Sequence, residues 1–418
     1  MTSLVGNRFG VAIIGGGPAG LAAALSASEE GASVLLIDSA ARLGGILKQC
    51  VQDDFGIVRY EKQLTGPEYA FKDIEALEQT NTIVMLQTTV TKIVSVTNGY
   101  QMTIINSHGV LVVEAGTIII ATGCKERTAR DANIQGSKPS GVMTAGTAQY
   151  YINIMGQLPM SRVIMLGSCD IGMTVAYRLS IEGAKVLGAY EPGSVPRGSL
   201  RNVSKYLYDP DIPIHFNHTV TRTFGTARLH SVELARVDKV QKLIKGTENM
   251  VNCDGLIVSA GLIPENSLVR TLNVPMDALT NGPKCDQNYM TLVDGIFCCG
   301  NALHIYDMVD YISLSGELAG KAAARYSHRE RRLIEISKSK EVLTVVPQYL
   351  DADTLHSDTI INFRINNTRE NVKVRLLVDG SEKFSETYDI IRSTEVKCIS
   401  VDFPGSIAPD SIVELRLE

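Results

Sequence analysis

Val11-Ala-Ile-Ile-Gly15-Gly-Gly17-Pro-Ala-Gly20 is followed by an Ala- and Leu-rich stretch and then by Val34-Leu-Leu-Ile-Asp38. The pattern is an apolar strand, a tight glycine turn, a helix and a second strand that ends in an acid, which is the form of a dinucleotide-binding βαβ unit. Gly15 and Gly17 would let backbone amides approach a pyrophosphate at the helix N-terminus. Gly20 would allow close packing of helix and strand, and Asp38 would accept hydrogen bonds from ribose hydroxyls.

A second copy lies about 150 residues further on, as Val163-Ile-Met-Leu-Gly167-Ser-Cys169-Asp-Ile-Gly172, and runs to Glu191. Two such units at domain-scale spacing predict a two-nucleotide flavoprotein. The second unit has Cys169 where the first has its middle glycine, and a side chain there would occupy the space of a phosphate contact. NAD(H) bound weakly through a shifted turn, another nucleotide such as ATP held as a structural ligand, and an empty pocket all remain open.

Glu191 stands at the expected ribose position of the second unit, which favours a free 2′-hydroxyl and hence NAD(H) over NADP. NAD(H) is therefore the ligand that we expect most at this site. The residues predicted to line the second nucleotide site are Gly167, Ser168, Cys169, Asp170, Ile171, Gly172, Glu191 and Gly261.

Composition describes an ordinary α/β protein of 418 residues, with 44% hydrophobic and 20% charged residues. The formal charge is -5, so nothing indicates a general affinity for nucleic acid or anionic lipid. The first residues lead directly into the first strand, and the glycines after Ile14 interrupt its apolar run. We therefore expect no secretory signal, no membrane span and a cytoplasmic location.

Eight scattered cysteines include no C-x-x-C or C-x-x-x-x-C pair. Metal sites and dithiol centres therefore lack their usual spacing, and we predict no metal site. The adjacent Cys298 and Cys299 lie in a strand-like run, where neighbouring side chains point to opposite faces, so a bond between them is not expected. Most of the eight are predicted to be buried, reduced packing residues.

The rest of the chain repeats one plan and then changes character. Helices are predicted over 67–79 and 310–325, and short β-branched runs over 82–120 predict an antiparallel meander that returns into a buried parallel strand. Strand patterns separated by turns after a basic, polar linker (327–340) predict a small antiparallel β-sandwich. The predicted fold is α/β, with two Rossmann-like domains, 1–125 plus 263–330 and 126–262, and a β-rich domain over 341–418.

Several motifs together resemble the pyridine nucleotide-disulphide oxidoreductase superfamily of flavoproteins, across about residues 10–330. They are the two βαβ units, the Ala121-Thr122-Gly123 strand end and the Gly300-Asn301 turn. More narrowly, Gly44-Gly45-Ile-Leu-Lys-Gln-Cys50, Thr144-Ala-Gly-Thr-Ala-Gln149 and Gly261-Leu-Ile-Pro-Glu-Asn266 resemble one subgroup of FAD/NAD-binding subunits. These accompany dye-linked proline dehydrogenases, opine oxidases, hydrogen cyanide synthase and the glycerol-operon oxidoreductase.

The resemblance implies that the first unit binds FAD. Asn301 departs from the family, which has Asp there, and an amide can hydrogen-bond a ribityl hydroxyl without bringing charge. The helix near Asp310 would point its positive end at the flavin. The residues that the resemblance assigns to FAD, together with those derived above, are Gly15, Gly17, Pro18, Ala19, Gly20, Asp38, Arg42, Gly44, Gly45, Ile46, Val90, Ala121, Thr122, Gly123, Gly300, Asn301, Tyr311 and Ile312.

No residue must act as a nucleophile, because hydride transfer to a flavin needs stacking and orientation. Lys48 and Cys50 could face the flavin or be ordinary loop residues. His304 is the best histidine for a proton donor, although a structural role is favoured. Asp307 and Asp310 share a helix face by their spacing, and Asp310 is either a catalytic group or a capping charge.

We expect an FAD-dependent oxidoreductase that works as one subunit beside a partner dehydrogenase or electron-transfer subunit, on glycerol 3-phosphate, an amino acid or an opine. Without its own dithiol, the chain must pass electrons to a partner's centre, a quinone or oxygen. One alternative is a self-contained NADH-dependent reductase of a small acceptor. The other is a non-catalytic nucleotide-binding scaffold with the β tail as a docking module.

Overall fold

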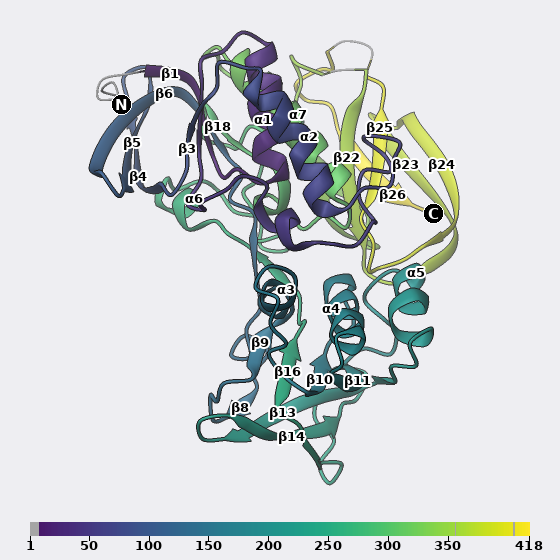
Figure 1. The fold of residues 1–418 in the computed structure, drawn as a ribbon. Coiled ribbons are helices and arrows are strands. Elements are labelled where there is room, and N and C mark those ends of the chain that lie inside the picture. The colour runs from purple at the N-terminus through teal and green to yellow at the C-terminus, as the bar shows by residue number, and fades with distance from the viewer. Residues whose placement is uncertain (1–7, 356, 404–405) are drawn as a thin grey trace. The chain divides into compact units, whose positions relative to one another are not determined.

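The computed structural model describes residues 8–355, 357–403 and 406–418, whose elements are drawn in Figure 1. Their contacts divide the chain into two compact units. Unit 1 comprises Met1–Lys48, Asp53–Cys124 and Pro264–Glu418, and unit 2 comprises Gln49–Gln52 and Lys125–Ile263. The short strands β7 (Cys124–Glu126) and β17 (Leu262–Pro264) lie where the chain passes from one unit to the other.

Unit 1 is built on a sheet of order β3-β2-β1-β6-β5-β4, with β18 paired to β6. Strand β6 belongs to two patterns: its first half pairs antiparallel with β5, and its end pairs parallel with β1 and β18. The predicted meander that returns into a buried parallel strand is therefore confirmed. These strands are β1 (Arg8–Ile14), β2 (Val34–Ile37), β3 (Ile83–Met85), β4 (Thr89–Val96), β5 (Gly99–Asn106), β6 (Gly109–Ile120) and β18 (Ile296–Cys298).

Helix α7 (Val309–Ala324) packs closely on α1 (Pro18–Glu29). A Cβ atom added at Gly316 would lie 2.1 Å from the Ala19 carbonyl oxygen, and one at Gly320 would lie 2.4 Å from the Ala23 oxygen. The two glycines share a helix face by their spacing, so they let the helix backbones approach. The helices predicted over 310–325 and 67–79 lie within a residue of the observed ends of α7 and of α2 (Gly66–Glu78).

The C-terminal part of unit 1 forms a sheet of order β21-β19-β26-β23-β24 and a second of order β20-β22-β25 around a separate apolar core. The predicted β-rich domain is thus present, but its pairing is not wholly antiparallel, because β19 and β26 are parallel. The strands are β19 (Leu333–Lys338), β20 (Val342–Val346), β21 (Tyr349–Asp351), β22 (Thr359–Ile365), β23 (Arg369–Val378), β24 (Ser381–Ile391), β25 (Lys397–Val401) and β26 (Val413–Leu417).

Strand β19 corrects the prediction of a polar linker over 327–340. Ile334 and Ile336 alternate with exposed residues and are buried in the C-terminal core. Alternation over a few residues is enough for a half-buried strand. The basic run that precedes it hid the pattern, because charged residues there dominate the local composition.

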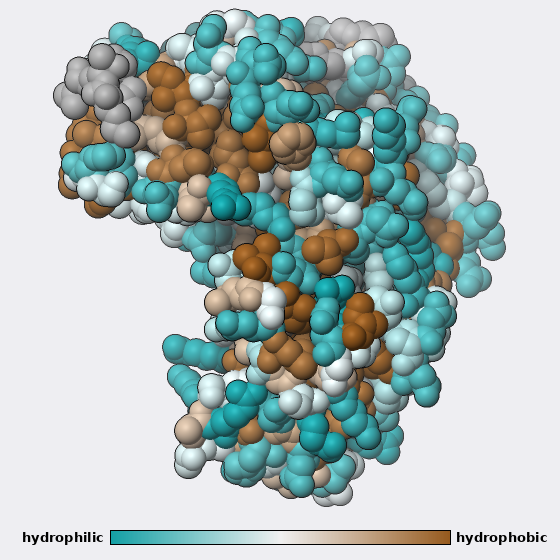
Figure 2. Space-filling view, viewed as in Figure 1, coloured by the Kyte–Doolittle hydropathy of each residue, from teal (hydrophilic) through white to brown (hydrophobic). Residues whose placement is uncertain are grey.

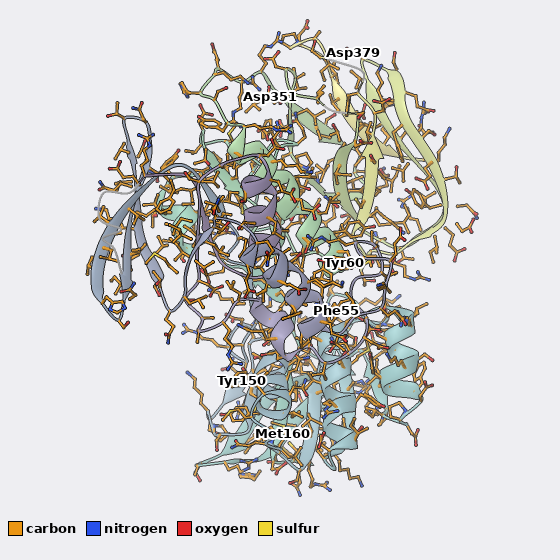
Figure 3. All side chains as sticks on the ribbon, turned by 45° about the horizontal axis from the view of Figure 1, so that its top comes forward. Phe55, Tyr60, Tyr150, Met160, Asp351 and Asp379 are labelled. Carbon is orange, nitrogen blue, oxygen red and sulfur yellow. The ribbon has the colours of Figure 1, made fainter. Side chains whose placement is uncertain are left out.

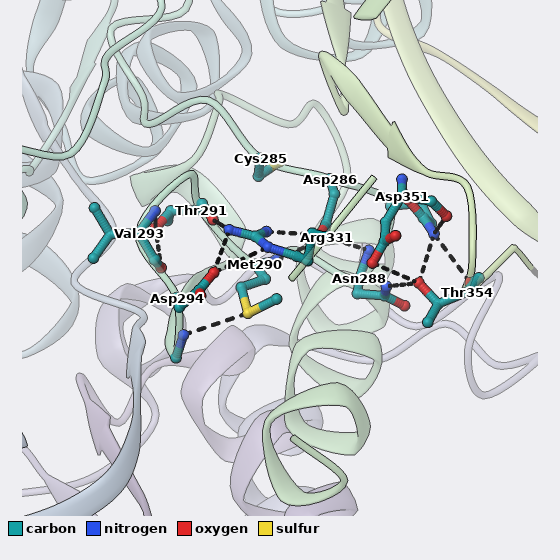
Figure 4. A network of polar contacts seen from close by, with 12 residues as sticks. Cys285, Asp286, Asn288, Met290, Thr291, Val293, Asp294, Arg331, Asp351 and Thr354 are labelled. Carbon is teal, nitrogen blue, oxygen red and sulfur yellow. Dashed lines mark hydrogen bonds and ion pairs between the residues drawn. The ribbon is translucent and has the colours of Figure 1, made fainter. Parts of the chain in front are cut away.

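A polar network joins this domain to the loop before β18 (Figure 4). The buried Arg331 guanidinium pairs with Asp286 at 2.9 Å and with Asp294 at 2.9 Å. Next to it, Gln287 donates to the Asp351 carbonyl oxygen and accepts from the Asp351 amide at 2.8 Å. Because these buried polar groups have partners, the network fixes the C-terminal domain on the loop that precedes β18.

Unit 2 has a parallel sheet of order β12-β11-β10-β16-β9 and a smaller sheet of order β15-β14-β13-β8. It is the second Rossmann-like unit, so the predicted fold class is confirmed. Its elements are β8 (Gln135–Gly136), β9 (Val142–Thr144), β10 (Arg162–Leu166), β11 (Lys185–Glu191), β12 (Ile214–Phe216), β13 (His218–Gly225), β14 (Leu229–Arg236), β15 (Asn249–Asn252), β16 (Gly255–Val258), α3 (Ala145–Asn153), α4 (Asp170–Ile181) and α5 (Leu200–Val203).

Some apolar side chains reach the surface of unit 1. Ile83, Val84 and Leu86, in and just after β3, are each more than a third exposed. Figure 2 shows apolar surface in the part of unit 1 that carries this strand. In the part of the chain that the structure describes, no helix combines the length and apolarity needed to cross a membrane.

Candidate functional site

The first glycine turn connects β1 to α1. Gly15 has φ +111°, and a Cβ atom there would lie 2.3 Å from the Ala121 carbonyl oxygen. A Cβ atom at Gly20 would lie 1.8 Å from the Gly15 oxygen. Packing within the protein therefore requires both glycines.

Gly17 differs from these two glycines. It caps α1 with φ −79°, an ordinary value, and a Cβ atom there would meet only Gly45 Cα, at 3.9 Å. The space above Gly17 is therefore free of protein side chains on this side. The first turn of α1 has no acidic residue and no side-chain cap, so its amides point into that space without a capping partner. A cradle that a Cβ atom would fill, beside a helix N-terminus, fits a pyrophosphate.

The loop Arg42–Gly45 closes over the same turn. The Gly44 amide donates to the Gly16 carbonyl oxygen at 2.8 Å, and a Cβ atom at Gly45 would lie 3.0 Å from Gly17 Cα. Arg42 and Ile46 are exposed beside it, and Lys48 donates from Nζ to the Arg42 carbonyl oxygen at 2.6 Å. The structure thus brings together two glycine-rich segments that were both predicted to bind FAD.

Asp38, at the end of β2, is tied to the turn. Its Oδ2 atom accepts from the Gly16 amide at 2.6 Å, and its Oδ1 atom accepts from the Ala40 amide at 2.7 Å. A carboxylate has further lone pairs, so Asp38 can still accept from a ribose hydroxyl.

The Gly300 turn lies against the start of α1. A Cβ atom at Gly300 would lie 2.7 Å from Ala19 Cβ and 3.3 Å from Ile312 Cγ2. Asn301 uses both ends of its amide, because Oδ1 accepts from the Tyr306 amide at 3.0 Å and Nδ2 donates to Cys124 Sγ at 3.6 Å. Ile312 and the neighbouring Tyr311 are half-buried in the first turn of α7.

The other predicted flavin residues have different surroundings. Pro18 is the first residue of α1, and Ala121 to Gly123 follow directly on β6, where Thr122 Oγ1 donates to the Glu265 carbonyl oxygen at 2.6 Å. Val90 is buried on β4 within the main apolar core. Its side chain therefore belongs to the interior of unit 1.

Asp310 anchors a loop. It is buried, and its carboxylate accepts from the backbone amides of Arg59 at 2.8 Å and Gly56 at 3.3 Å. Asp307 lies before α7, where it accepts from Arg364 at 2.6 Å. The prediction that Asp307 and Asp310 share a helix face is wrong, because the helix begins at Val309.

Arg59, which was not among the predicted site residues, holds the same loop. Its guanidinium contacts Asp73 at 2.6 Å, on α2, and Glu317 at 2.8 Å, on α7. Tyr60, labelled with Phe55 in Figure 3, donates to Asp73 at 2.7 Å. Asp73 is buried, so Arg59 provides its compensating charge. An arginine in an irregular stretch carries no periodic signal, and nothing in the sequence marks this one.

Two of the candidate catalytic groups, Cys50 and His304, are uncharged at pH 7. Burial raises the pKa of Cys50 to about 12, and its Sγ atom lies 3.8 Å from Gln149 Oε1. Burial, with a smaller contribution from the Arg364 charge, lowers the pKa of His304 to about 3. Cys50 is therefore a thiol and His304 a neutral imidazole at pH 7, and neither has the ionised form that a nucleophile or an imidazolium acid requires.

The second glycine turn, in unit 2, repeats the first. Gly167 has φ +94°, and a Cβ atom there would lie 2.1 Å from the Ser259 carbonyl oxygen. One at Gly172 would lie 2.4 Å from Ser259 Oγ. Ser259 is thus the counterpart of Ala121, and it was not predicted, although Ser259-Ala260-Gly261 parallels the end of the first unit.

Cys169 caps α4 with φ −77° and ψ 161°, a backbone conformation close to that of Gly17. Burial raises its pKa, so it is a thiol. The buried Glu191 accepts from the Ser168 amide at 3.1 Å and from Ser168 Oγ at 2.7 Å. The acid at the strand end therefore braces the turn in both units.

A cavity of about 580 Å³ opens beside this turn within unit 2. It is lined by Gly167, Glu191 and Ser259 from the turn and by Arg127, Arg197 and Arg222. The other predicted residues lie close to the turn: Asp170 accepts from Ser199 and Asn202, Ile171 packs on the neighbouring core, and Gly261 accepts from the Arg127 amide at 2.9 Å. A largely apolar cavity that also carries arginines and a carboxylate next to a glycine turn fits a nucleotide.

A family model described as pyridine nucleotide-disulphide oxidoreductase matches residues 9–325. Among curated proteins, an opine oxidase subunit of Agrobacterium tumefaciens (strain Ach5) is 24% identical over 75% of this chain and 65% of its own length. Hydrogen cyanide synthase subunit HcnB of Pseudomonas aeruginosa is 26% identical over 74% of this chain and 66% of its own. The chain thus spans just under two thirds of these relatives.

Solved structures share the fold. The thioredoxin reductase of T. acidophilum superposes with a TM-score of 0.64 at 21% identity, over 76% of this chain and 98% of its own. The L-proline dehydrogenase of P. horikoshii gives 0.52 at 19% identity, over 75% of this chain and 54% of its own.

Proposed function

Because this chain belongs to the pyridine nucleotide-disulphide oxidoreductase family of FAD-dependent oxidoreductases, we propose that it works as the flavin-bearing subunit of a larger electron-transfer assembly. The family match confirms the resemblance that the sequence motifs indicated. In this role, electrons that reach the flavin leave it for a partner protein.

The observation that carries the proposal is a flavin-type fold without a redox dithiol. All eight cysteines, each within the described residues, are thiols outside any disulphide. Burial raises the pKa of the Cys298 thiol well above its ordinary value, and that of Cys299 to about 12. A disulphide reductase of this fold needs two adjacent reactive sulphurs. The described part of this chain does not supply them, so electrons must pass to an acceptor outside it.

The residues that would hold FAD fit it. The free space above Gly17 and the amides of α1 would receive the diphosphate, with Gly44 and Gly45 closing over it. Asp38 would accept from the adenosine ribose, and the second N–H of Asn301 would reach a ribityl hydroxyl. FAD supplies hydride and single-electron transfer. The protein binds and orients it, and Tyr311 and Ile312 pack where its ring is expected.

Both curated relatives are named as subunits, one of opine oxidase and one of hydrogen cyanide synthase. This supports a partner for our chain as well. The partner would be a dehydrogenase acting on an amino acid, an opine or glycerol 3-phosphate, and it would feed electrons to the flavin or receive them from it.

A second candidate is a self-contained NADH-dependent reductase of a small acceptor. The cavity in unit 2 and the braced Glu191 favour it, because both are features of a nucleotide site. Under this alternative NAD(H) binds above Cys169.

Two measurements test these proposals. The purified chain should be yellow, or become so with added FAD, and a colourless protein after supplementation would contradict both. Anaerobic stopped-flow with NADH, followed at the flavin visible maximum, then separates them. Slow or absent bleaching supports the subunit role, whereas fast bleaching followed by turnover with a small acceptor supports the self-contained reductase.

A further inference from the structure

Residues 303–308 connect the Gly300 turn to α7, the two elements that flank the predicted flavin ring. The first half of this connection is anchored in the main part of unit 1, where Leu303 is buried in the apolar core and the His304 amide donates to the Gly300 carbonyl oxygen at 3.4 Å. The Tyr306 amide donates to Asn301 Oδ1 at 3.0 Å, and the Leu303 amide donates to the Gly300 carbonyl oxygen at 2.9 Å. The hydrogen-bond partners of the Asp307 carboxylate, just before Val309, lie in a different part of unit 1.

The C-terminal β domain supplies these partners. Arg364, on β22, donates to Asp307 Oδ1 at 2.6 Å and to the Ile305 carbonyl oxygen at 3.3 Å. The second terminal nitrogen of Arg364, Nη1, donates to the Thr394 carbonyl oxygen. The Val396 amide donates to Asp307 Oδ2. Both oxygens of Asp307 are thus held by the β domain, two residues before α7 begins.

The Arg364–Asp307 pair is more than an exposed ion pair. The Arg364 side chain is 22% exposed, and it adds backbone carbonyl contacts to the carboxylate contact, so one planar guanidinium fixes three groups. Its charge also reaches the neighbouring His304, whose pKa it helps to lower. The β domain therefore acts on the chain that leads into the flavin helix.

We propose that the C-terminal β domain positions the N-terminus of α7 for the flavin, with Arg364 as a positioning residue that acts through Asp307 and Ile305. The inference rests on the FAD site proposed above. It gives the β domain a role within the flavin site, in place of the docking role considered from the sequence.

The test compares Arg364→Ala with Arg375→Ala. Arg375 lies on β23 of the same domain, is 27% exposed and pairs with Glu382 and Glu418, so it matches Arg364 in charge and burial. In Arg364→Ala the FAD dissociation constant should rise about tenfold, a loss of about 1.4 kcal/mol. Arg364→Lys should recover part of the loss, and Arg375→Ala should bind FAD as wild type does.

The flavin midpoint potential is the readout that a merely structural role would leave unchanged. A tenfold difference in the loss of affinity between oxidised and reduced FAD appears as a shift of about 30 mV. Equal dissociation constants and equal potentials in the two alanine variants would overturn the inference. If Arg364→Ala does not fold, Asp307→Asn removes the charge at constant size and should give the same shift.

Amide hydrogen exchange of residues 303–312, measured without FAD, separates this inference from the proposed function. Exchange there should be faster in Arg364→Ala than in Arg375→Ala if the contacts of Arg364 with Asp307 and Ile305 hold this segment (the tether). If the wild-type chain binds no FAD but the two variants still differ in exchange, the proposed function is contradicted and the contact of Arg364 with Asp307 is supported. Wild-type exchange in both variants contradicts the tether itself.

Discussion

Cys169 Sγ lies 2.6 Å from Ser259 Oγ, across the glycine turn of unit 2. The thiol therefore leans toward the end of β16 while its Cβ atom stays at the position that is open space above Gly17 in the first unit. Because the backbone angles at Cys169 and Gly17 are so similar, the cysteine fits the turn itself. The Cys169 side chain would therefore hinder the binding of a ligand at this turn, while it leaves the fold unstrained.

Cys169→Gly should therefore strengthen NADH binding by at least tenfold, because it restores backbone contact with a diphosphate. Stability should change by less than about 1 kcal/mol, since glycine is an acceptable N-cap. NADH titration followed by flavin bleaching measures the first and urea unfolding the second. Cys253→Ala, at a buried cysteine of the same unit, is the control and should leave NADH affinity unchanged.

Gly17→Ala should lower FAD affinity, whereas Gly15→Ala should lower stability. The first places a methyl group where protein atoms are distant, so the chain should fold and lose at least tenfold in FAD affinity. The second drives Cβ against Ala121 at a positive φ, so it should cost about 2–4 kcal/mol of stability. Flavin content and thermal unfolding measured on both variants distinguish the effects. Full retention of FAD by the Gly17→Ala variant would contradict the diphosphate assignment.

The chain should take up two electrons per flavin, and not four. A redox disulphide beside a flavin would store a second pair of electrons, and the eight cysteines here are thiols outside any disulphide. Anaerobic dithionite titration counts the equivalents directly. Consumption of four would show that two cysteines form a redox pair in solution.

Acid should destabilise the fold through His304. Its pKa is about 3 in the folded state and near 6.5 when unfolded, so the unfolded chain binds the proton more tightly between these values. Stability is therefore highest above pH 6.5 and falls as the pH drops, by roughly 2–3 kcal/mol at pH 4.5. Urea unfolding at pH 7.5 and pH 4.5 measures it. In His304→Gln the pH-dependent part should shrink, and an unchanged pH dependence would assign the loss to other groups.

Arg59→Met should destabilise unit 1 by about 3–5 kcal/mol, because it leaves the buried Asp73 without a compensating charge. Arg325→Ala removes the exposed pair with Glu30 and should leave the stability of unit 1 almost unchanged. Denaturant unfolding of both variants gives the comparison. Equal small losses would mean that Asp73 takes up a proton or water in place of Arg59.

Local pattern predicted the architecture well, because the βαβ units, the meander and α7 are encoded by periodicity and glycine turns. It also found the two turns that face each other at Gly17 and Gly45. It missed groups whose partners lie far along the chain: Arg59 with Asp73 and Glu317, and Arg364 with Asp307. Their roles come from tertiary packing, which leaves no periodic trace in one sequence. Asp307 was misread because its three-residue spacing to Asp310 was taken as helical, whereas the helix begins only at Val309. Strand β19 was missed because basic neighbours masked its alternation.

The contact of α1 with α7 constrains the order in which the molecule can form. Ser26 Oγ donates to the Glu317 carbonyl oxygen across 291 positions of sequence, whereas most of unit 2 is the continuous segment Lys125–Ile263. During synthesis the second unit emerges whole while the first still lacks its closing helix. The Ala-rich face of α1 must therefore stay uncovered until its partner helix has been made, far later in translation. This unfinished first half, with an apolar helix face uncovered, is the species most exposed to misassociation during synthesis.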